Sequence, residues 1–295
     1  MKILLTGGKG FIARNLCEQL CTEHQVCAPG SEELDLLDAP KVGNFIKDGG
    51  FDVVVHTATY DAAPKASTKD PSKVLEKNLR MFFSVARCSR DFGKMIYFGS
   101  GAEFSREHWK PRMAEDYFDA NIPCDQYGLS KYIMTKYAQS SANIYNLRLF
   151  GVFGKYDDWR YRFIPNVCAR AAINLPVIIN QCRFFDFLYI DDLARIVSWF
   201  IANKPSGKVY NVCTGAPQDF KTLAEKAVRI SGKKLKIIVQ NPGSGVEYSG
   251  DNSALLEELK GFKFTSPDTG IKIVYDWCES RRADISKAAA DGQLL

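Results

Sequence analysis

Short apolar segments alternate with longer amphipathic ones along the first half of the chain. Residues 3–5 and the β-branched run at residues 53–55 predict strands that are buried on both faces of a sheet. In residues 11–20 the apolar side chains recur at helical spacing, which predicts a helix. By the same patterns we expect strands at residues 25–28, 95–98 and 144–149 and helices at residues 73–92 and 127–139. Strands that alternate with helices predict an α/β fold with a doubly wound parallel sheet.

Beyond Gly154 the pattern is less regular and predicts a smaller, mixed α/β part. We expect a first domain at residues 1–155, to which parts of residues 180–215 return. A second domain at residues 156–295 would cover the carboxyl edge of the sheet. Gly243-Ser244-Gly245 is the best linker candidate. In this second part we expect helices near residues 166–172, 193–202 and 220–231, and strands near residues 177, 187 and 235–239.

The composition is that of an ordinary soluble globular protein. Of the 295 residues, 46% are hydrophobic and 25% are charged, which excludes disordered, collagen-like and coiled-coil chains. No stretch approaches the roughly 18 apolar residues that a membrane span needs, so we expect no membrane partner. The apolar run at the start is too short for a signal peptide. The net charge of +5 is too small and dispersed to suggest a nucleic-acid partner, but it suits an anionic small ligand.

The nine cysteines indicate a reducing compartment, so we expect a cytoplasmic protein. Their number is odd and they show no Cys-x-x-Cys spacing, which argues against both a disulfide framework and a zinc site. They fall mostly at apolar positions of the expected helices and strands, where cysteine serves as a small hydrophobic residue. We see no cluster of His, Asp and Glu residues that suggests a metal.

Glycines join the first expected strand to the first expected helix. Gly8, Gly10 and Ala13 fit a G-x-G-x-x-A spacing, while Gly7, Gly10 and Ala13 fit G-x-x-G-x-x-A. Such glycines allow a tight turn and bring backbone N–H groups against a pyrophosphate at the helix N-terminus. A flexible turn without a ligand is the simpler alternative. The position between a strand and a helix favours a dinucleotide site and a Rossmann-type fold.

The residues after the second expected strand favour NADPH over NAD. NAD sites usually place an acidic residue there for the ribose 2′-hydroxyl, but Pro29-Gly30-Ser31 follows the strand and the first acid is Glu32. Lys9 lies inside the glycine loop, where its ammonium could meet a 2′-phosphate. The alternative is a solvated lysine, and NAD remains the alternative cofactor.

Tyr127 and Lys131 are four residues apart and therefore share one helix face. A nearby ammonium lowers the pKa of a tyrosine, so that the phenol can exchange a proton with a carbonyl or an alcohol. The spacing alone is not specific, because Tyr132 and Lys136 repeat it. The two pairs differ by five residues, about 140° of helix rotation, so they cannot face one site.

Ser100 supports the first of these two pairs. It follows the strand expected at residues 95–98, and a serine at the carboxyl end of a parallel strand points at the ligand crevice. There it could hydrogen-bond the same oxygen as Tyr127. A hydroxyl that only caps the strand is the alternative.

Taken in order, these motifs resemble those of the extended short-chain dehydrogenase/reductases, in particular the NAD-dependent epimerase/dehydratase group that acts on nucleotide sugars. The resemblance covers essentially the whole chain. The motifs are Thr6-Gly7-x-x-Gly10-x-x-Ala13, Asp35-Leu36-Leu37-Asp38, His56-Thr57-Ala58, Asn78, Ser100, Tyr127-x-x-x-Lys131, Arg148-Leu149-Phe150-Gly151-Val152-Phe153-Gly154, Asp186-Phe187-Leu188-Tyr189-Ile190-Asp191-Asp192 and Tyr210-Asn211-Val212-x-x-Gly215.

The resemblance implies a role for each matching residue. Ser100, Tyr127 and Lys131 would be the catalytic set. Residues 1–155 would form the dinucleotide-binding domain and residues 156–295 the substrate-binding domain. The expected cofactor-binding residues are Gly7, Lys9, Gly10, Phe11, Ile12, Ser31, Asp35, Leu36, Thr57, Ala58, Asn78 and Lys131. The expected substrate-binding residues are Arg162, Asn166 and Arg183. The two guanidinium groups suit a diphosphate, and a plain surface charge is the alternative for each arginine.

Within the family the chain is most similar to nucleotide-sugar 4-ketoreductases such as GDP-L-fucose synthases and dTDP-4-dehydrorhamnose reductases. This similarity implies NADPH-dependent reduction of the C4 keto group of a nucleotide-diphospho-4-keto-6-deoxy sugar, in the synthesis of deoxysugar or polysaccharide precursors. Fucose synthases also epimerise, with a cysteine and a histidine where this chain has Ala102 and Arg162, which favours simple reduction. The family's usual arginine before Asp186 is Phe185 here, and Gly151 replaces a common asparagine.

Two other functions remain open. One is a nucleotide-sugar epimerase with tightly bound NAD⁺, and the other is a catalytically retired scaffold that senses nucleotides. A dehydratase is disfavoured, because Gly101 and Ala102 stand where those enzymes carry an Asp-Glu pair, although Glu103 follows. Apolar runs at residues 81–83 and 132–134 suggest a homodimer, but packing within one chain explains them equally well.

Overall fold

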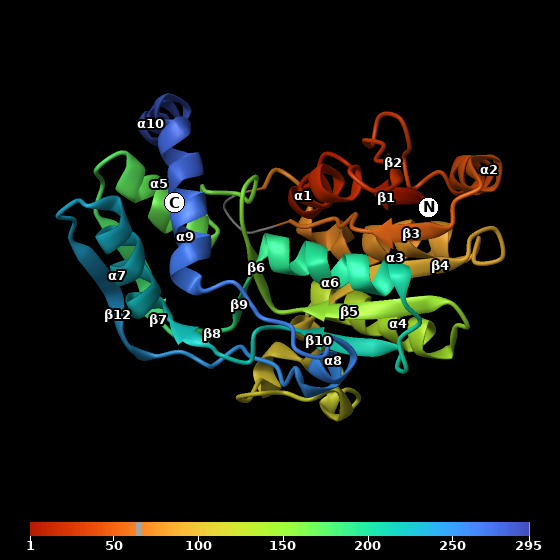
Figure 1. The fold of residues 1–295 in the computed structure, drawn as a ribbon. Helices are drawn as coiled ribbons and strands as arrows, with labels where there is room; N and C mark the ends of the chain where they lie inside the picture. The colour runs from red at the N-terminus through yellow and green to blue at the C-terminus, as the bar shows by residue number, and fades with distance from the viewer. Residues whose placement is uncertain (63–66, 295) are drawn as a thin grey trace.

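The computed structural model describes residues 1–62 and 67–294, and its centre is a parallel β-sheet (Figure 1). Within those residues the sheet has six strands in the order β10-β5-β4-β3-β1-β2. The α/β fold with a doubly wound parallel sheet is thereby confirmed. The strands are β1 (Lys2–Thr6), β2 (Gln25–Cys27), β3 (Val53–His56), β4 (Lys94–Ser100), β5 (Ile144–Leu149) and β10 (Val209–Val212).

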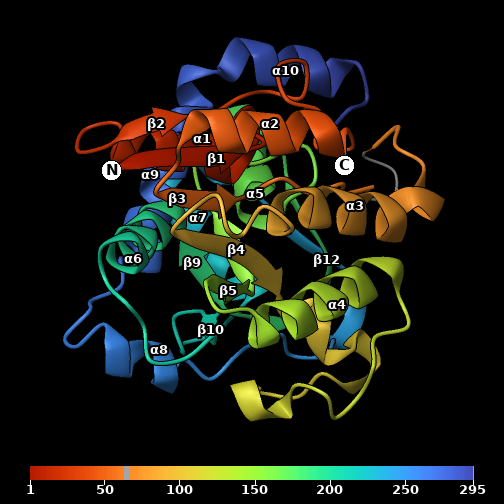
Figure 2. The ribbon, with the colours of Figure 1, turned by 90° about the vertical axis from the view of Figure 1, so that its right-hand side faces the viewer.

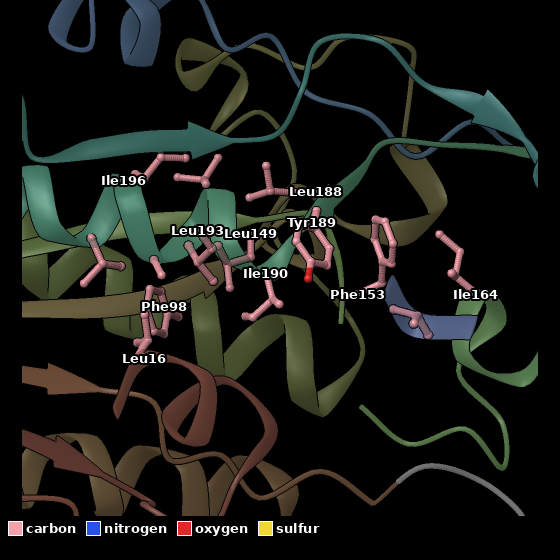
Figure 3. Close-up of a cluster of buried hydrophobic side chains, with 14 of the residues drawn as sticks. Leu16, Phe98, Leu149, Phe153, Ile164, Leu188, Tyr189, Ile190, Leu193 and Ile196 are labelled. Carbon is pink, nitrogen blue, oxygen red and sulfur yellow. The ribbon is translucent and has the colours of Figure 1, made fainter. Parts of the chain in front are cut away.

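Helices cover both faces of the sheet because successive strand residues point to opposite sides. On one face Ile3 and Leu5 pack with α1 (Phe11–Leu20) and α6 (Ile190–Ala202). Figure 3 shows Leu193 and Ile196 of α6 in this cluster. On the other face Leu4 packs with the remaining sheet helices, and Figure 2 shows α6 on one side of the sheet with α3 and α4 on the other. Those helices are α2 (Ala39–Gly49), α3 (Val74–Ala86) and α4 (Gln126–Ser140).

Helix α2 has no counterpart among the expected elements, and α3 is shorter than expected. Only Val42 and Ile46 of α2 are buried, so its apolar period is too sparse to read from the sequence. Asp38 begins the helix by accepting a hydrogen bond from the Lys41 N–H at 3.1 Å. Helix α3 ends at Ala86 instead of Phe92, because the following residues turn back toward β4.

The second half of the chain builds a separate group of helices beside the sheet (Figure 1). Helices α5, α7 and α9 pack on one another next to the parallel strand pair β7–β12. Strand β10 joins the central sheet and helix α6 packs on it. The predicted domain boundaries, residues 1–155 and 156–295, remain a prediction. The elements are β6 (Gly151–Phe153), α5 (Phe163–Ala172), β7 (Val177–Cys182), β8 (Phe184–Phe185), β9 (Phe187–Tyr189), β11 (Gln218–Asp219), α7 (Phe220–Ser231), β12 (Ile237–Ser244), α8 (Ser253–Glu258), α9 (Pro267–Ser280) and α10 (Arg282–Ala290).

The linker expected at residues 243–245 is wrong. Gly243 and Ser244 belong to β12, and Ser244 is paired with Cys182 of β7. The Gly245 N–H donates to the Cys182 carbonyl oxygen at 2.8 Å. The glycines accommodate an irregular strand end, where the pairing register shifts between Asn241 and Ser244.

None of the helices within residues 1–62 and 67–294 combines the length and the apolar character needed to cross a membrane.

Candidate functional site

A cavity of about 1370 Å³ lies where the sheet strands end and the second half of the chain begins. Single small-molecule sites usually enclose about 300–1000 Å³, so this cavity has room for a dinucleotide and a second ligand. Most of the expected site residues line it. They are Gly7, Lys9, Gly10, Phe11, Ile12, Ser31, Asp35, Leu36, Thr57, Ala58, Ser100, Tyr127, Lys131, Arg162 and Arg183.

The glycine loop is built for close approach of the backbone. A Cβ on Gly8 would lie 1.9 Å from the Ala28 carbonyl oxygen, and Gly7 has a φ of +69° beside Ala58. Both glycines are therefore needed, whichever register is used. Gly10 caps α1 without any side-chain hydrogen bond, so the N–H groups of the first turn are left facing the cavity. This arrangement fits the pyrophosphate of a dinucleotide.

Lys9 forms an ion pair with Glu32, with 2.9 Å between Nζ and Oε2. Both side chains are largely exposed, and the hydrogen bond raises the pKa of Lys9 and lowers that of Glu32. Lys9 remains exposed to solvent, and its contact with a 2′-phosphate remains a prediction. The pair sets a cation and an anion side by side near Ser31, where the cofactor's ribose was expected.

The segment after β3 is held to β1 by hydroxyl groups. Thr57 Oγ1 donates to the Thr6 carbonyl oxygen at 2.6 Å. Asn78 does not belong to the described residues that line the cavity. Its side-chain oxygen instead accepts the Tyr60 N–H at 2.7 Å, so Asn78 holds the shape of this segment. Its role in cofactor binding remains a prediction.

The structure brings Ser100, Tyr127 and Lys131 together on the cavity wall. Ser100 ends β4, while Tyr127 and Lys131 lie on α4, which begins where Asp125 accepts the Gly128 N–H at 2.9 Å. Lys131 Nζ donates to the carbonyl oxygen of Phe98 at 2.8 Å. It lies 5.7 Å from the centroid of the Tyr127 ring.

Burial controls the protonation of this group. It lowers the pKa of Lys131 to about 8, although the charge of Glu103 opposes the shift. It also raises the pKa of Tyr127, helped by Asp61 and opposed by the Ser100 hydroxyl and by nearby arginines. The expected fall in the Tyr127 pKa is therefore wrong for this structure, and the phenol is protonated at neutral pH.

The second tyrosine–lysine pair lies outside the cavity. Tyr132 donates to Asp119 at 2.5 Å, and Lys136 forms an ion pair with the same carboxylate at 2.7 Å. Neither residue is among the described residues that line the cavity. The two pairs therefore face different surroundings, as the rotation argument predicts, and the catalytic role of Tyr127 and Lys131 remains a prediction.

Glu103 contacts the backbone of Ser100 and is not among the described residues that line the cavity. Its side chain is fully buried, accepts the Ser100 N–H at 2.9 Å and pairs with the buried Arg148 at 2.8 Å. The full burial of Arg148 was not expected from the sequence. This arrangement gives Glu103 a structural position.

The three expected substrate residues differ in position. Arg162 lies at the start of α5, lines the cavity and pairs at 2.8 Å with Asp61, which lines it too. Arg183 also lines the cavity. Asn166 is buried and donates to the carbonyl oxygens of Trp159 and Arg160 at 3.1 and 2.9 Å, so it holds the preceding loop. Contact of these residues with a substrate remains a prediction.

An aromatic wall on the same cavity was not expected from the sequence. It combines aromatic residues from both halves of the chain and lines the same cavity as Ser100 and Tyr127. A local sequence pattern cannot predict this wall, because its rings come from residues that are far apart in the sequence and meet only in the folded protein. Its members are Trp109, Phe150, Phe163, Phe185, Phe187, Phe220 and Tyr248. The buried Asp157, whose pKa is raised to about 7 by burial, also lines the cavity.

A family model for NAD dependent epimerases and dehydratases matches residues 3–213, which include the glycine loop, Ser100, Tyr127 and Lys131. The chain belongs to the NAD dependent epimerase/dehydratase family. The family resemblance stated from the motifs is thereby confirmed. Membership makes the chain an NAD(P)-dependent enzyme of the oxidoreductase type.

Among curated members of the NAD dependent epimerase/dehydratase family, GDP-L-colitose synthase of Yersinia pseudotuberculosis is 23% identical over 75% of this chain and 78% of its own. The solved structure of a GDP-L-fucose synthetase from Naegleria fowleri bound to NADP has a TM-score of 0.84 and 18% identity, and covers 96% of this chain and 93% of its own. The UDP-glucose 4-epimerase of Thermotoga maritima has a TM-score of 0.80 and 20% identity, and covers 95% and 99%. At these identities the structures show the shared fold.

Proposed function

We propose that this protein uses NADPH to reduce the C4 keto group of a nucleotide-diphospho-4-keto-6-deoxy sugar. The observation that carries the proposal is the convergence of Ser100, Tyr127 and Lys131 on one cavity with the glycine loop. The names of similar proteins support it, since they include a GDP-L-colitose synthase and an NADP-bound GDP-L-fucose synthetase. A role in the synthesis of deoxysugar or polysaccharide precursors is part of the proposal.

The residues of the site suit a carbonyl reduction. NADPH, when bound, supplies the hydride. Tyr127 is protonated at neutral pH and can donate its proton to the C4 oxygen, while Ser100 holds that oxygen by a hydrogen bond. Lys131 is fixed by the Phe98 carbonyl oxygen and can orient the nicotinamide ribose and supply positive charge beside the phenol.

The glycine loop suits NADPH, because it offers groups for both the pyrophosphate and a 2′-phosphate. The N–H groups at the start of α1 can bind the pyrophosphate, and Lys9 can meet a 2′-phosphate once it exchanges Glu32 for the ligand. Glu32 in turn can accept a hydrogen bond from a 2′-hydroxyl, which keeps NAD as the alternative cofactor.

Simple reduction is favoured over combined epimerisation and reduction. Ala102 is 1% exposed and has no proton to transfer, and Arg162 is permanently charged and paired with Asp61. A nucleotide-sugar epimerase that retains NAD⁺ is the second candidate, because the fold matches UDP-glucose 4-epimerase with a TM-score of 0.80.

The test is consumption of NADPH, followed by its near-ultraviolet absorbance, with GDP-, dTDP-, CDP- and UDP-linked 4-keto-6-deoxy sugars and with NADH in parallel. Oxidation with one nucleotide class is the expected result and identifies the nucleotide. No oxidation, with NAD⁺ released on denaturation, would support the epimerase. No oxidation and no bound cofactor would support the nucleotide-sensing scaffold.

We further propose a cytoplasmic homodimer that pairs through α3 and α4. Tyr137 of α4 is 37% exposed and packs edge-on against Phe83 of α3, with ring centroids 5.2 Å apart. Phe82 and Met134 are buried within the chain, so only part of the expected apolar surface is available. Sedimentation of the wild type and of Tyr137→Asp tests the pairing: a dimer that becomes a monomer supports it, and a monomeric wild type contradicts it.

A further inference from the structure

A group of buried polar side chains lies between β4, β5 and α4, outside the cavity. Its members are Tyr97, Thr135 and Asn146, and the exposed fraction of each is 0%. None of the three is among the described residues that line the cavity. Burial of polar groups costs free energy unless each group is hydrogen-bonded, so their hydrogen bonds show which parts of the chain they hold together.

Asn146 joins the backbone before Ser100 to helix α4. Its side-chain oxygen accepts the Gly99 N–H at 2.9 Å, and its amide nitrogen donates to Thr135 Oγ1 at 2.7 Å. An asparagine side chain carries both an acceptor and a donor group, so it can bind a strand and a helix at the same time. The end of β4 and the middle of α4 are therefore tied to one side chain of β5.

Tyr97 extends this connection to Lys131. Its hydroxyl shares a hydrogen bond of 3.0 Å with Thr135 Oγ1 and donates to the Lys131 carbonyl oxygen at 3.1 Å, while Glu103 Oε1 is the more distant acceptor at 3.3 Å. The Tyr97 ring also lies beside the Lys131 ammonium, with 5.3 Å between Nζ and the ring centroid. One residue of β4 thus contacts both the backbone and the side chain of Lys131.

Gly99 supplies the space that these side chains need. A Cβ at this position would lie 2.3 Å from Asn146 Oδ1 and 2.2 Å from Glu103 Oε1, so a larger residue would push both side chains away from the end of β4. Glu103 in turn accepts the Ser100 N–H at 2.9 Å. The two consecutive N–H groups of residues 99 and 100 are therefore both bound by buried side chains outside the cavity.

We propose that Asn146, Thr135 and Tyr97 are positioning residues that set the distance between Ser100 and Lys131. Ser100 and Lys131 come from different elements, so their separation depends on what joins β4 to α4. The three side chains form a continuous series of hydrogen bonds from the Gly99 N–H to the Lys131 carbonyl oxygen. None of them touches the reacting atoms. This inference rests on the proposed function of the site.

Thr135 is the best position for a test, because one substitution removes its hydroxyl and another keeps it. Thr135→Val keeps the shape of the side chain and breaks the series of hydrogen bonds. We expect it to lower kcat at least about 10-fold with KM changed by less than about twofold, since a misplacement of about 1 Å can cost about 100-fold in rate. Thr135→Ser retains the hydroxyl and should keep kcat within about threefold of wild type. Thr222→Val on α7, outside the described lining of the cavity, is the matched control and should behave as wild type.

A residue that only filled space would give the opposite order, because valine keeps the shape of threonine and serine leaves a gap. A double-mutant cycle then asks whether the hydroxyls act together. Tyr97→Phe removes the next hydroxyl and keeps the ring beside Lys131. We expect Tyr97→Phe/Thr135→Val to lose little more activity than Thr135→Val alone.

Three results would overturn the assignment: wild-type kcat in Thr135→Val, equal losses in Thr135→Val and Thr135→Ser, or fully additive losses in the double variant. Wild type that reduces none of the keto sugars would contradict the proposed function instead, and amide hydrogen exchange then decides about the positioning. Exchange in residues 95–104 that is at least about 10-fold faster in Thr135→Val than in wild type and Thr135→Ser supports it. Equal exchange in all three proteins overturns it.

Discussion

Single buried groups set the charge state of the site. His56 is buried next to Lys131, and burial, with the charge of Lys131, lowers its pKa to about 3. It is therefore neutral, and its Nδ1 shares a hydrogen bond of 3.0 Å with Thr6 Oγ1. His56 is a buried residue of β3 and carries no charge at neutral pH.

Replacement of Tyr127 by Phe should remove turnover while cofactor binding is kept. General acid catalysis contributes about 100- to 10,000-fold, so we expect kcat to fall by at least about 100-fold. Titration of NADPH fluorescence should give a dissociation constant close to that of wild type. Tyr132→Phe is the control, since Tyr132 binds Asp119 instead of lining the cavity. Unchanged turnover in Tyr127→Phe would rule out its catalytic role.

The activity should decline as the pH rises through about 8. Burial lowers the pKa of Lys131 to about 8, so its charge is present below that pH and lost above it. Tyr127, with a raised pKa, stays protonated across this range. A profile of kcat/KM against pH should therefore show a descending limb near pH 8. Lys131→Arg cannot lose its proton, so in that variant whatever activity persists should lack this limb. A limb of the same position in both proteins would assign it to another group.

Elements whose apolar side chains recur regularly were predicted well. Helices α1 and α7 and strand β5 have the bounds that the sequence predicts. Helix α2 was missed because two glycines and a proline dilute its pattern, and the segment at residues 243–245 was misread because its glycines lie in an irregular strand end.

The candidate site was predictable for a topological reason. The glycine loop, Ser100 and the start of α4 follow parallel strands, which all end at one edge of the sheet. The aromatic wall was not predictable, because Trp109 and Tyr248 meet only through tertiary packing of the two halves. The same holds for Arg162 and Asp61, whose pairing joins two distant loops.

The turn between β1 and α1 gives a prediction with an internal control. Gly8→Ala would place its Cβ 1.9 Å from the Ala28 carbonyl oxygen, so the loop must shift. We expect NADPH binding, measured by fluorescence, to weaken at least about 10-fold, since the N–H groups of α1 lose their alignment. Gly43→Ala on α2 meets no atom within 4 Å and should keep binding while it stabilises the fold by about 0.4–1 kcal/mol. Wild-type affinity in Gly8→Ala would contradict this account of the loop.

At the scale of the whole molecule, one buried ion pair connects three distant segments. Glu103 follows β4, Arg148 lies in β5, and Arg148 Nη1 donates to the Asn211 side chain of β10 at 3.0 Å. Both charged side chains are fully buried. Each charge is therefore tolerated only because the other is present.

Glu103→Gln should destabilise the protein and impair the site. The substitution leaves the Arg148 charge buried without its carboxylate, which typically costs about 3–5 kcal/mol. Chemical denaturation should show this loss of unfolding free energy. In Glu103→Gln/Arg148→Met the buried charge is gone, so we expect a large part of the stability to return. A single variant as stable as wild type would show that the pair contributes little.

Strand β10 at the edge of the sheet has a consequence for synthesis on the ribosome. The residues of the glycine loop, Ser100, Tyr127 and Lys131 all precede β5, but the partner strand of β5 is made only when residues 209–212 emerge. At roughly 5–20 residues per second, about 3–13 s separate the end of β5 from the end of β10. During that interval the edge of β5 and the Arg148 side chain lack their β10 partners. Such an unpaired edge favours pairing with another strand or chain, and completion of β10 removes it.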